Sequence, residues 1–321
     1  ILLLLVVIAS YVLTGRQGEI AYIGLADILV NYFGVVLQNF CYIVLFVLVV
    51  GGFYGVLNKI PAYKKLLDKI VTSVKPLGKK AIFVTILLFA VIASLTGMTM
   101  QLIIFVPFVA SIIILLGYDK LVALSSTIVS ILIGYIGGVF VNFVNPNTYT
   151  VGTYEEFVGV SSKFANTFPK LLLLFAGIAL LIYFVNKHII NVEKKKVNYE
   201  LKDDSELMIN EIKGDYKSIK VWPIITTFAL LFVILVIGMI PWNTLFGITI
   251  FSDFHTWLQG LKIGNFAVLS NIFSANLPAL GEWSGSGNPM VHYVFISMLI
   301  LFMLLIIVLL NKVKFNEAID N

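Results

Sequence analysis

The sequence has 321 residues, of which 60% are hydrophobic and only 12% are charged, with a mean hydropathy of +1.00 and a formal net charge of +5. A soluble globular domain carries about 25% charged residues, so these values exclude that class and predict an all-α polytopic membrane protein. No basic stripe interleaves with aromatic residues, so we expect no nucleic-acid partner. The single cysteine, Cys41, excludes a disulfide framework.

The first 80 residues alternate apolar runs with polar turns. Ile1–Leu13 is a short apolar run that we interpret as the remainder of a first span, Ala21–Leu37 is typical of an interfacial segment, and Asn39–Leu57 has the length of a full span. Lys59–Lys80 contains seven lysines and one acid, with apolar residues at helical spacing. This pattern predicts an amphipathic helix on the membrane surface.

The uncharged stretch Ala81–Gly117 has an unusual length for membrane spans. As one helix it would be about 55 Å long, almost twice the thickness of the hydrocarbon core, and as two full spans with a turn it is slightly short. Two half-length helices of roughly 20 and 24 Å that meet at a polar tip, Ser94–Gln101, fit better. We therefore predict a re-entrant hairpin over 81–117, whose tip must be surrounded by protein or water because its backbone is unpaired.

The next apolar run breaks at an Asn-Pro pair. Leu121–Phe140 has the composition of a span, and it is followed by the polar stretch Val141–Thr150, in which Pro146 removes a backbone donor. We predict a discontinuous helix over 121–150, followed by a further span at Phe164–Val185.

The remaining chain divides at its longest charged segment. Residues 187–220 hold eight lysines and seven acids and predict a solvated linker. Val221–Ile240 and Met290–Leu310 predict spans, and the segment between them has polar turns. The predicted domains are a first membrane repeat (1–186), the cytoplasmic linker (187–220), and a connecting span, an external segment and the start of an incomplete second repeat (221–321).

The basic residues orient these segments. With a re-entrant hairpin, 18 of the 22 Lys and Arg residues fall on one side, which the positive-inside rule makes cytoplasmic. The N-terminus, 59–80 and 187–220 are then cytoplasmic, in a multi-pass protein of the cell inner (plasma) membrane. Two short spans in place of the hairpin give the same sides, so both alternatives stay open, whereas one long span would turn the lysine-rich linker outward. The four basic residues on the outside are Arg16, Lys163, Lys170 and Lys262.

Small polar residues gather at the hairpin tip and at the helix break. Hydroxyls, amides and freed backbone groups supply neutral donors for a carboxylate and oxygen ligands for Na⁺. The alternative is that the hydroxyls bond back to their own helices and that the Asn-Pro pair is a kink or a loop. The candidate substrate-binding and ion-binding residues are Ser94, Thr96, Gly97, Thr99, Gln101, Asn142, Asn145, Asn147 and Thr148.

Other side chains give weaker indications. We find no ionisable residue within the hydrocarbon part of the predicted spans, which makes a proton-relay pump less favoured than a carrier coupled to Na⁺ or to a counter-substrate. His188, His255 and His292 lack metal-ligand spacing and are interpreted as interface residues, so no metal site is predicted. Trp222, Trp242, Trp257 and Trp283 are interpreted as interfacial anchors.

Three segments resemble a known family. GGFYGVLNKIPAYKKLLDKI, SLTGMTMQLIIFVPFVASIIILLGYDKLVALS and VNPNTYTVG are similar to the span with its amphipathic helix, the hairpin and the helix break of the YfcC and C4-dicarboxylate anaerobic carrier (DcuC-like) family of the ion transporter superfamily. The resemblance implies two inverted repeats, each with a re-entrant hairpin and a discontinuous helix, in a homodimer. It also implies that Ser94, Thr96 and Thr99 act together with the residues of the break. Since one hairpin and one break are missing, we expect the sequence to be a fragment of a longer carrier.

The function expected from this resemblance is secondary active transport of small organic anions or amino acids, with C4-dicarboxylates as the model substrates. No cofactor is expected apart from Na⁺ as a coupling ion. The alternatives are a cation/proton antiporter of the same superfamily, a membrane enzyme acting on a lipid-linked substrate, and a scaffold or sensor without transport.

Overall fold

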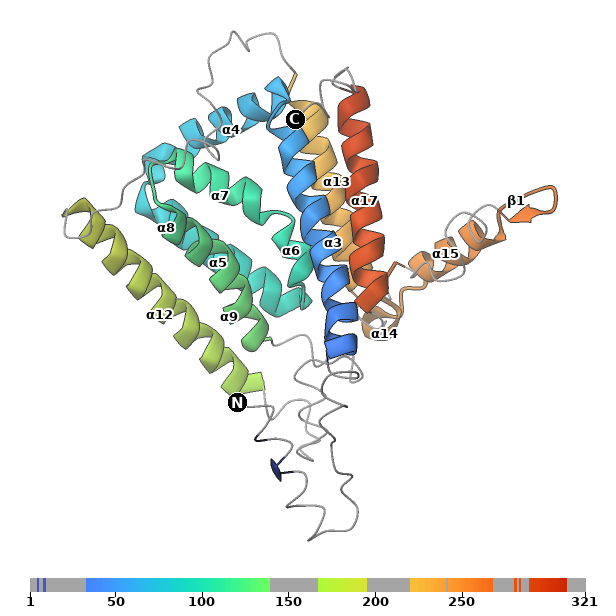
Figure 1. Cartoon of the computed structure of the whole chain (residues 1–321), viewed down its shortest axis with the longest axis horizontal. Coiled ribbons are helices and arrows are strands. Elements are labelled where there is room, and N and C mark those ends of the chain that lie inside the picture. The colour runs from blue at the N-terminus through green and yellow to red at the C-terminus, as the bar shows by residue number, and fades with distance from the viewer. Residues whose placement is uncertain are drawn as a thin grey trace.

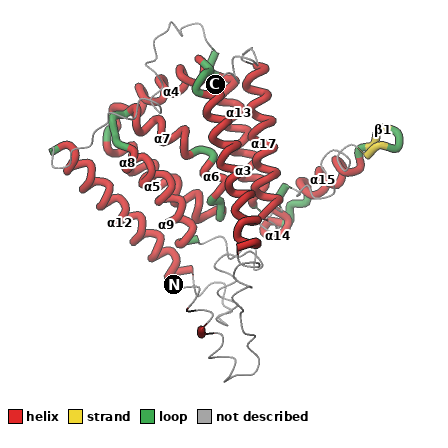
Figure 2. Tube along the Cα trace, in the orientation of Figure 1, coloured by secondary structure: helices red, strands yellow, loops and turns green. Residues whose placement is uncertain are grey.

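The computed structural model describes residues 5, 8–9, 33–138, 167–194, 220–240, 242–267, 280–281, 283 and 289–310, which are almost entirely helical (Figures 1 and 2). Five helices in this part of the chain are long and apolar enough to cross a membrane. They are α3 (Phe33–Leu57), α5 (Lys79–Thr96), α12 (Thr167–Glu193), α13 (Trp222–Met239) and α17 (Pro289–Leu310). The prediction of an all-α polytopic membrane protein is confirmed.

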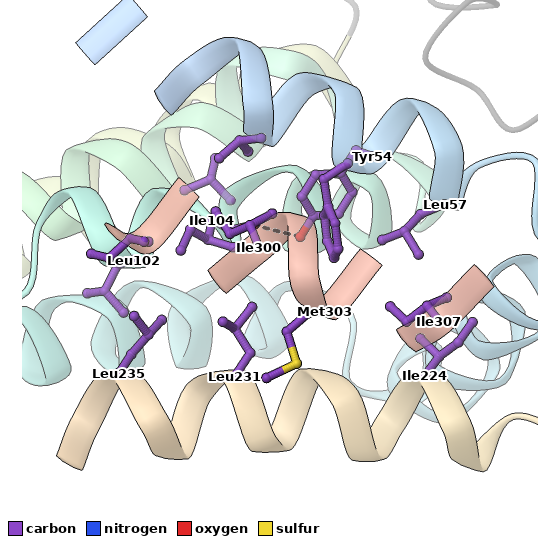
Figure 3. Close-up of a cluster of buried hydrophobic side chains, with 14 of the residues drawn as sticks. Tyr54, Leu57, Leu102, Ile104, Ile224, Leu231, Leu235, Ile300, Met303 and Ile307 are labelled. Atoms are coloured by element: carbon purple, nitrogen blue, oxygen red, sulfur yellow. Dashed lines mark hydrogen bonds between the residues drawn. The ribbon is translucent and has the colours of Figure 1, made fainter. Parts of the chain in front are cut away.

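Helices α3, α13 and α17 stand side by side and form what we call the support layer (Figure 1). Their interior is built from large apolar side chains, among them Leu231, Ile300 and Ile307, all fully buried (Figure 3). The opposite faces of the same helices are apolar and exposed, because they meet lipid. In lipid such helices are held together mainly by van der Waals packing, since lipid tails are as apolar as leucine.

Helix α4 (Pro61–Val74) connects the support layer to the hairpin. It begins with Pro61, whose missing N–H costs nothing at a helix start. Ala62, Tyr63, Leu66 and Leu67 are buried against the apolar core, and the lysines occupy the other positions. The structure thus contains an amphipathic helix within the predicted range Lys59–Lys80, and the short helix η2 (Lys75–Leu77) follows it; the position of this helix on the membrane surface stays a prediction.

The chain then doubles back at the predicted tip. Helix α5 ends at Gly97, whose backbone is left-handed (φ +68°), and the return limb consists of α6 (Met100–Ile103) and α7 (Val106–Leu115). Ile82 from the start of α5 and Ile113 from the end of α7 are buried in the same cluster, so the two limbs return to one end of the molecule.

The two limbs are less alike than the sequence predicted. Helix α5 has 18 residues and is about 27 Å long, which is enough to cross a bilayer, because no residue interrupts it before Gly97. The return limb is divided at Ile104 and Phe105, just before Pro107, which cannot continue the hydrogen bonds of the preceding turn.

Next to the hairpin lies a helix with an irregular centre. It runs through α8 (Lys120–Leu124), one π-helical turn, η3 (Ser125–Val129), and α9 (Ser130–Ile136). Helix α9 packs between α5 and α12, and with α7 and α8 these helices form what we call the hairpin layer (Figure 1). Helix α12 continues to Glu193, past residue 186 where the sequence analysis places the start of the linker.

The segment after α13 contains small elements that the sequence analysis did not predict. These are α14 (Trp242–Phe246), α15 (Ile250–Gly260) and a two-stranded antiparallel hairpin of β1 (Lys262–Ile263) and β2 (Phe266–Ala267). Trp283 is fully buried against Gly238 of α13, so its interpretation as an interfacial anchor is wrong. Both the Gly281 and the Trp283 N–H groups donate to the Gly238 carbonyl, which fastens this segment to the end of α13.

Candidate functional site: the hairpin tip

Ser94 joins the hairpin tip to the neighbouring helix. It lies in the last turn of α5, with 2% of its surface exposed, and its hydroxyl donates to the carbonyl of Gly137 over 2.9 Å. Gly137 follows the last residue of α9 and precedes the predicted break. The tip and the helix that leads to the break are therefore in direct contact.

Helices α5 and α9 can approach so closely because Gly134, which has no side chain, lies at their contact. A Cβ atom at Gly134 would lie 2.7 Å from the Cβ of Ala93, and closer still to the carbonyl oxygen of Ala90. Small residues are the usual way for membrane helices to bring their backbones together. The close contact places Ser94 within hydrogen-bonding reach of α9.

Thr96 and Gln101 organise the turn itself. The Thr96 hydroxyl donates to the Ile92 carbonyl over 2.6 Å and accepts the N–H of Met98 over 3.2 Å. The N–H of Thr99 donates to Oε1 of Gln101 over 3.3 Å, and Gln101 is buried. Thr96 thus follows the alternative in which a hydroxyl bonds back to its own helix, while also fixing the turn after Gly97.

The structure gathers one half of the predicted site. Ser94, Thr96, Gly97, Thr99 and Gln101 lie in one turn at the end of α5 and the start of α6. Asn142, Asn145, Asn147 and Thr148 lie outside the described residues, so their position relative to the tip stays a prediction. The site described here is a neutral, hydroxyl-rich turn that contacts the end of α9.

Sequence reasoning missed a second group of buried hydroxyls. Ser126, Thr127 and Ser130 are fully buried in and beside the π-helical turn. Ser126 and Thr127 donate to the carbonyls of Val122 and Ala123, each over 2.7 Å. The available signal was the cluster SSTIVS inside an apolar run, and π-helical turns are frequent at functional sites.

The opposite end of the hairpin is held by two pairs of polar side chains. Oδ2 of Asp119 lies 2.6 Å from Nε2 of His188 on α12, and Oδ1 of Asp119 accepts the N–H of Val122 and caps α8. Lys79 at the start of α5 pairs with Glu193 at the end of α12 over 2.8 Å. Helix α12 is therefore tied to the hairpin at one end by the Asp119–His188 and Lys79–Glu193 pairs and to α9 at the other by close packing.

The comparison with protein families covers nearly the whole chain. A model of the C4-dicarboxylate anaerobic carrier family matches residues 6–320. The chain belongs to the C4-dicarboxylate anaerobic carrier family. The match extends well beyond the three segments on which the resemblance in the sequence rests, and it confirms that resemblance. No curated protein and no solved structure matches the chain.

Membership of the C4-dicarboxylate anaerobic carrier family makes the protein a transporter and not an enzyme. Its substrate is a small molecule, its surroundings are a lipid bilayer, and the hydroxyl and amide groups of the tip can bind solute without any covalent chemistry. Within the described ranges, no three His, Cys, Asp or Glu side chains come together as a metal site. Hydroxyl and carbonyl oxygens are nevertheless suitable ligands for a hard monovalent or divalent cation.

Proposed function

We propose that this chain is a secondary active transporter that carries C4-dicarboxylates and related small organic anions, including amino acids, coupled to Na⁺ or to a counter-substrate. Family membership supports a carrier. The observation on which the site assignment rests is the hydrogen bond from Ser94 to the Gly137 carbonyl. It connects the polar turn of the hairpin to the helix that precedes the Asn-Pro break.

The tip has the chemistry that a carboxylate site requires. Gly97 interrupts the helix, and its left-handed backbone turns the chain where hydroxyl and amide groups cluster. Helix starts that face a cavity add partial positive charge to a site of this kind. In this proposal the hairpin is re-entrant and its tip, together with 142–148, forms one wall of the solute site.

Transport requires that the site open alternately to each side. We propose that the hairpin layer moves as one body. Within this layer, α12 is fixed to the other helices at both ends, by the Asp119–His188 pair and by the contact of Gly137 with Leu174. The support layer would remain in place, as in an elevator-like or rocking motion. The same proposal includes a homodimer, a cytoplasmic α4 and linker, and the three-part division of the chain, with its first boundary moved from residue 186 to the end of α12 at Glu193.

Uptake into proteoliposomes tests the function. The purified protein would be supplied with labelled C4-dicarboxylates or amino acids, with and without an inward Na⁺ gradient, and with and without unlabelled substrate inside. We expect saturable dicarboxylate uptake that either the Na⁺ gradient or internal substrate accelerates. If neither class of solute enters under any of these conditions, the proposed function is wrong.

Two substitutions test the site. We expect Thr96→Ala and Asn145→Ala to lower dicarboxylate flux about tenfold at unchanged expression, because each removes a polar group from the proposed site. Ser73→Ala is a matched control, since Ser73 makes the same type of bond back to its helix, to the Lys69 carbonyl over 2.8 Å, on the exposed surface of α4. If both site variants transport like the wild type, the site assignment is wrong, although the proposed transport function is not affected.

A cation/proton antiporter is the second candidate, and one observation favours it. Asp119 is a buried carboxylate paired with His188, and such groups mark proton paths in membrane proteins. A pH-sensitive dye inside the proteoliposomes discriminates the two functions. Antiport predicts that added Na⁺ moves protons without dicarboxylate, and this proton movement should be lost in Asp119→Asn.

A further inference from the structure

Helix α15 has one apolar side and one polar side. Ile250, Phe254, Trp257 and Leu261 follow one another at spacings of four, three and four residues, which places them along one side of the helix. The other side carries hydroxyl, carboxylate and amide groups. Ile250 is 64% exposed, Phe254 45% and Trp257 58%, and no residue of the helix is buried. In water an apolar side this exposed would be unfavourable.

The β-hairpin after α15 adds to this apolar surface. Ile263 and Phe266 are directly opposite each other in the two strands, so their side chains lie on the same face of the hairpin. They are 75% and 50% exposed. Large apolar side chains are thus exposed on two consecutive elements, whereas on an ordinary water-facing surface they are scattered singly.

The base of α15 is fixed to the end of α13. Nε1 of Trp242 in α14 donates to the Ile237 carbonyl of α13 over 2.8 Å, and the Trp242 ring lies 5.7 Å from that of Phe246 and 5.4 Å from that of Phe251 in α15. Gly247, between α14 and α15, has a left-handed backbone (φ +66°), and the chain changes direction there. Helix α15 therefore leaves the support layer in a defined direction, outward from the end of α13 and the start of α17 (Figure 1).

The length and the surroundings of α15 identify what covers its apolar side. Its 11 residues extend over about 16 Å, roughly half the hydrocarbon thickness, so it cannot cross the bilayer. It begins where α13 ends, and the outer faces of α13 and α17 are apolar, exposed and turned to lipid. Phe254 and Trp257 are stacked with ring centroids 5.7 Å apart, and aromatic rings gather at the membrane–water interface. We infer that α15 lies in the bilayer interface and that its apolar side continues the lipid-facing surface of the support layer.

This contact with lipid requires no charge. Helix α15 contains no lysine or arginine, and its one acidic residue, Asp253, accepts the hydroxyl of Thr249 over 2.9 Å. An interfacial helix of this composition is held by the burial of apolar area and needs no anionic headgroup. Zwitterionic phospholipid is therefore a sufficient partner. The inference requires only that the protein is embedded in a membrane, so it does not depend on the substrate.

Spin labels on the two sides of α15 test this inference. In a Cys41→Ser background, I250C and F254C place the label on the apolar side, and T256C and Q259C place it on the polar side. All four positions are exposed, so the labels displace no packed side chain. In zwitterionic proteoliposomes, we expect the ratio of relaxation by oxygen to relaxation by an aqueous nickel chelate to be at least about threefold higher on the apolar side, because oxygen concentrates in the acyl chains. Equal ratios on the two sides overturn the inference.

Two other results also contradict it. A second copy of the chain on the apolar side would shield positions 250 and 254 from both reagents and would bring two labels at 254 close enough to broaden their spectrum. A difference between the two sides that is seen only in vesicles with anionic lipid would show that charge, and not apolar burial, holds α15 to the membrane.

Photolabelling of the wild-type protein does not depend on the cysteine variants. Phospholipids with diazirines at several depths of the acyl chain modify the side chains that they contact, and peptide mass spectrometry locates the modified residues. The outer face of α17 is the internal positive control, since Phe302 is 58% exposed and Leu309 66%. We expect α15 to be modified to an extent comparable with that face, at Ile250, Phe254 and Trp257. Modification of α17 without modification of α15 overturns the inference.

Discussion

The support layer and the hairpin layer are built on different physical principles. The support layer is filled with large apolar side chains, and its buried serine and threonine hydroxyls, Ser297 and Thr227, bond back to their own helices. The hairpin layer contains a left-handed turn at Gly97, a π-helical turn, and a hydroxyl that bonds to another helix. Irregular backbone and buried polar groups are costly in a membrane. Their concentration in the hairpin layer is the reason that we propose the solute site there.

The largest expected effect concerns the contact between α5 and α9. Gly134→Ala should destabilise the protein by about 3 kcal/mol, because its new Cβ would overlap the Ala90 carbonyl and Ala93 and force the helices apart. Gly52→Ala on α3 is the matched control, since no atom lies within 4 Å of the position that its Cβ would take. The measurement is the melting temperature in detergent. Equal melting of the two variants would mean that the hairpin layer is not closely packed.

The second expected effect concerns the buried charge at the base of the hairpin. Asp119→Ala removes both the partner of His188 and the cap of α8, and should cost about 2–3 kcal/mol. Asp119→Asn keeps a capping side chain and loses only the charge, so it should cost less. Thermal unfolding of both variants separates the two contributions. If Asp119→Ala melts like the wild type, the base of the hairpin does not depend on this pair.

The features best predicted from the sequence are those that depend on neighbouring residues alone, namely the apolar spans and the glycine turn. Val221–Ile240 and Met290–Leu310 correspond to α13 and α17 within one residue at each end, because a span requires a fixed apolar length. The predicted span Asn39–Leu57 ends with α3, but α3 begins at Phe33, inside the stretch predicted as an interfacial segment. The turn at Gly97 was also predictable, since glycine commonly ends a helix.

The features that were missed depend on distant contacts or on weak local signals. Asp119 and His188 are 69 residues apart in the chain, so their pairing could not be read from spacing. The burial of Trp283 depends on the space left by Gly238. Helix α15 has a readable apolar spacing at Ile250, Phe254 and Trp257, but the polar turns around it masked this signal.

The third effect has opposite signs at two neighbouring tyrosines, whose ring centroids are 6.3 Å apart. Tyr54 of the support layer donates to the Ile104 carbonyl of the hairpin over 2.6 Å (Figure 3), so Tyr54→Phe should cost about 1 kcal/mol. The Tyr63 hydroxyl is the one buried side-chain polar atom in the described residues that lacks a partner. Burial raises the pKa of Tyr63, so its hydroxyl stays protonated although that proton makes no hydrogen bond. Tyr63→Phe should therefore stabilise the protein by about 1 kcal/mol, as measured by thermal unfolding.

If both tyrosine variants are destabilised equally, the Tyr63 hydroxyl has a partner after all. If neither changes, the Tyr54 bond does not hold the hairpin to the support layer.

The smallest effect should come from the second ion pair of the hairpin layer, that of Lys79 with Glu193. Their side chains are 34% and 55% exposed, so water and salt screen the attraction, and Lys79→Gln should cost less than about 0.5 kcal/mol. Raising the salt concentration should remove even this difference, while the deficit of Asp119→Ala should persist because Asp119 is buried. Melting curves of both variants at low and high salt make the comparison. A large loss of stability in Lys79→Gln that persists at high salt would show that this end of α12 is buried in the membrane-embedded protein. The Lys79–Glu193 pair would then contribute as much as the Asp119–His188 pair, and the two would stabilise the hairpin layer together.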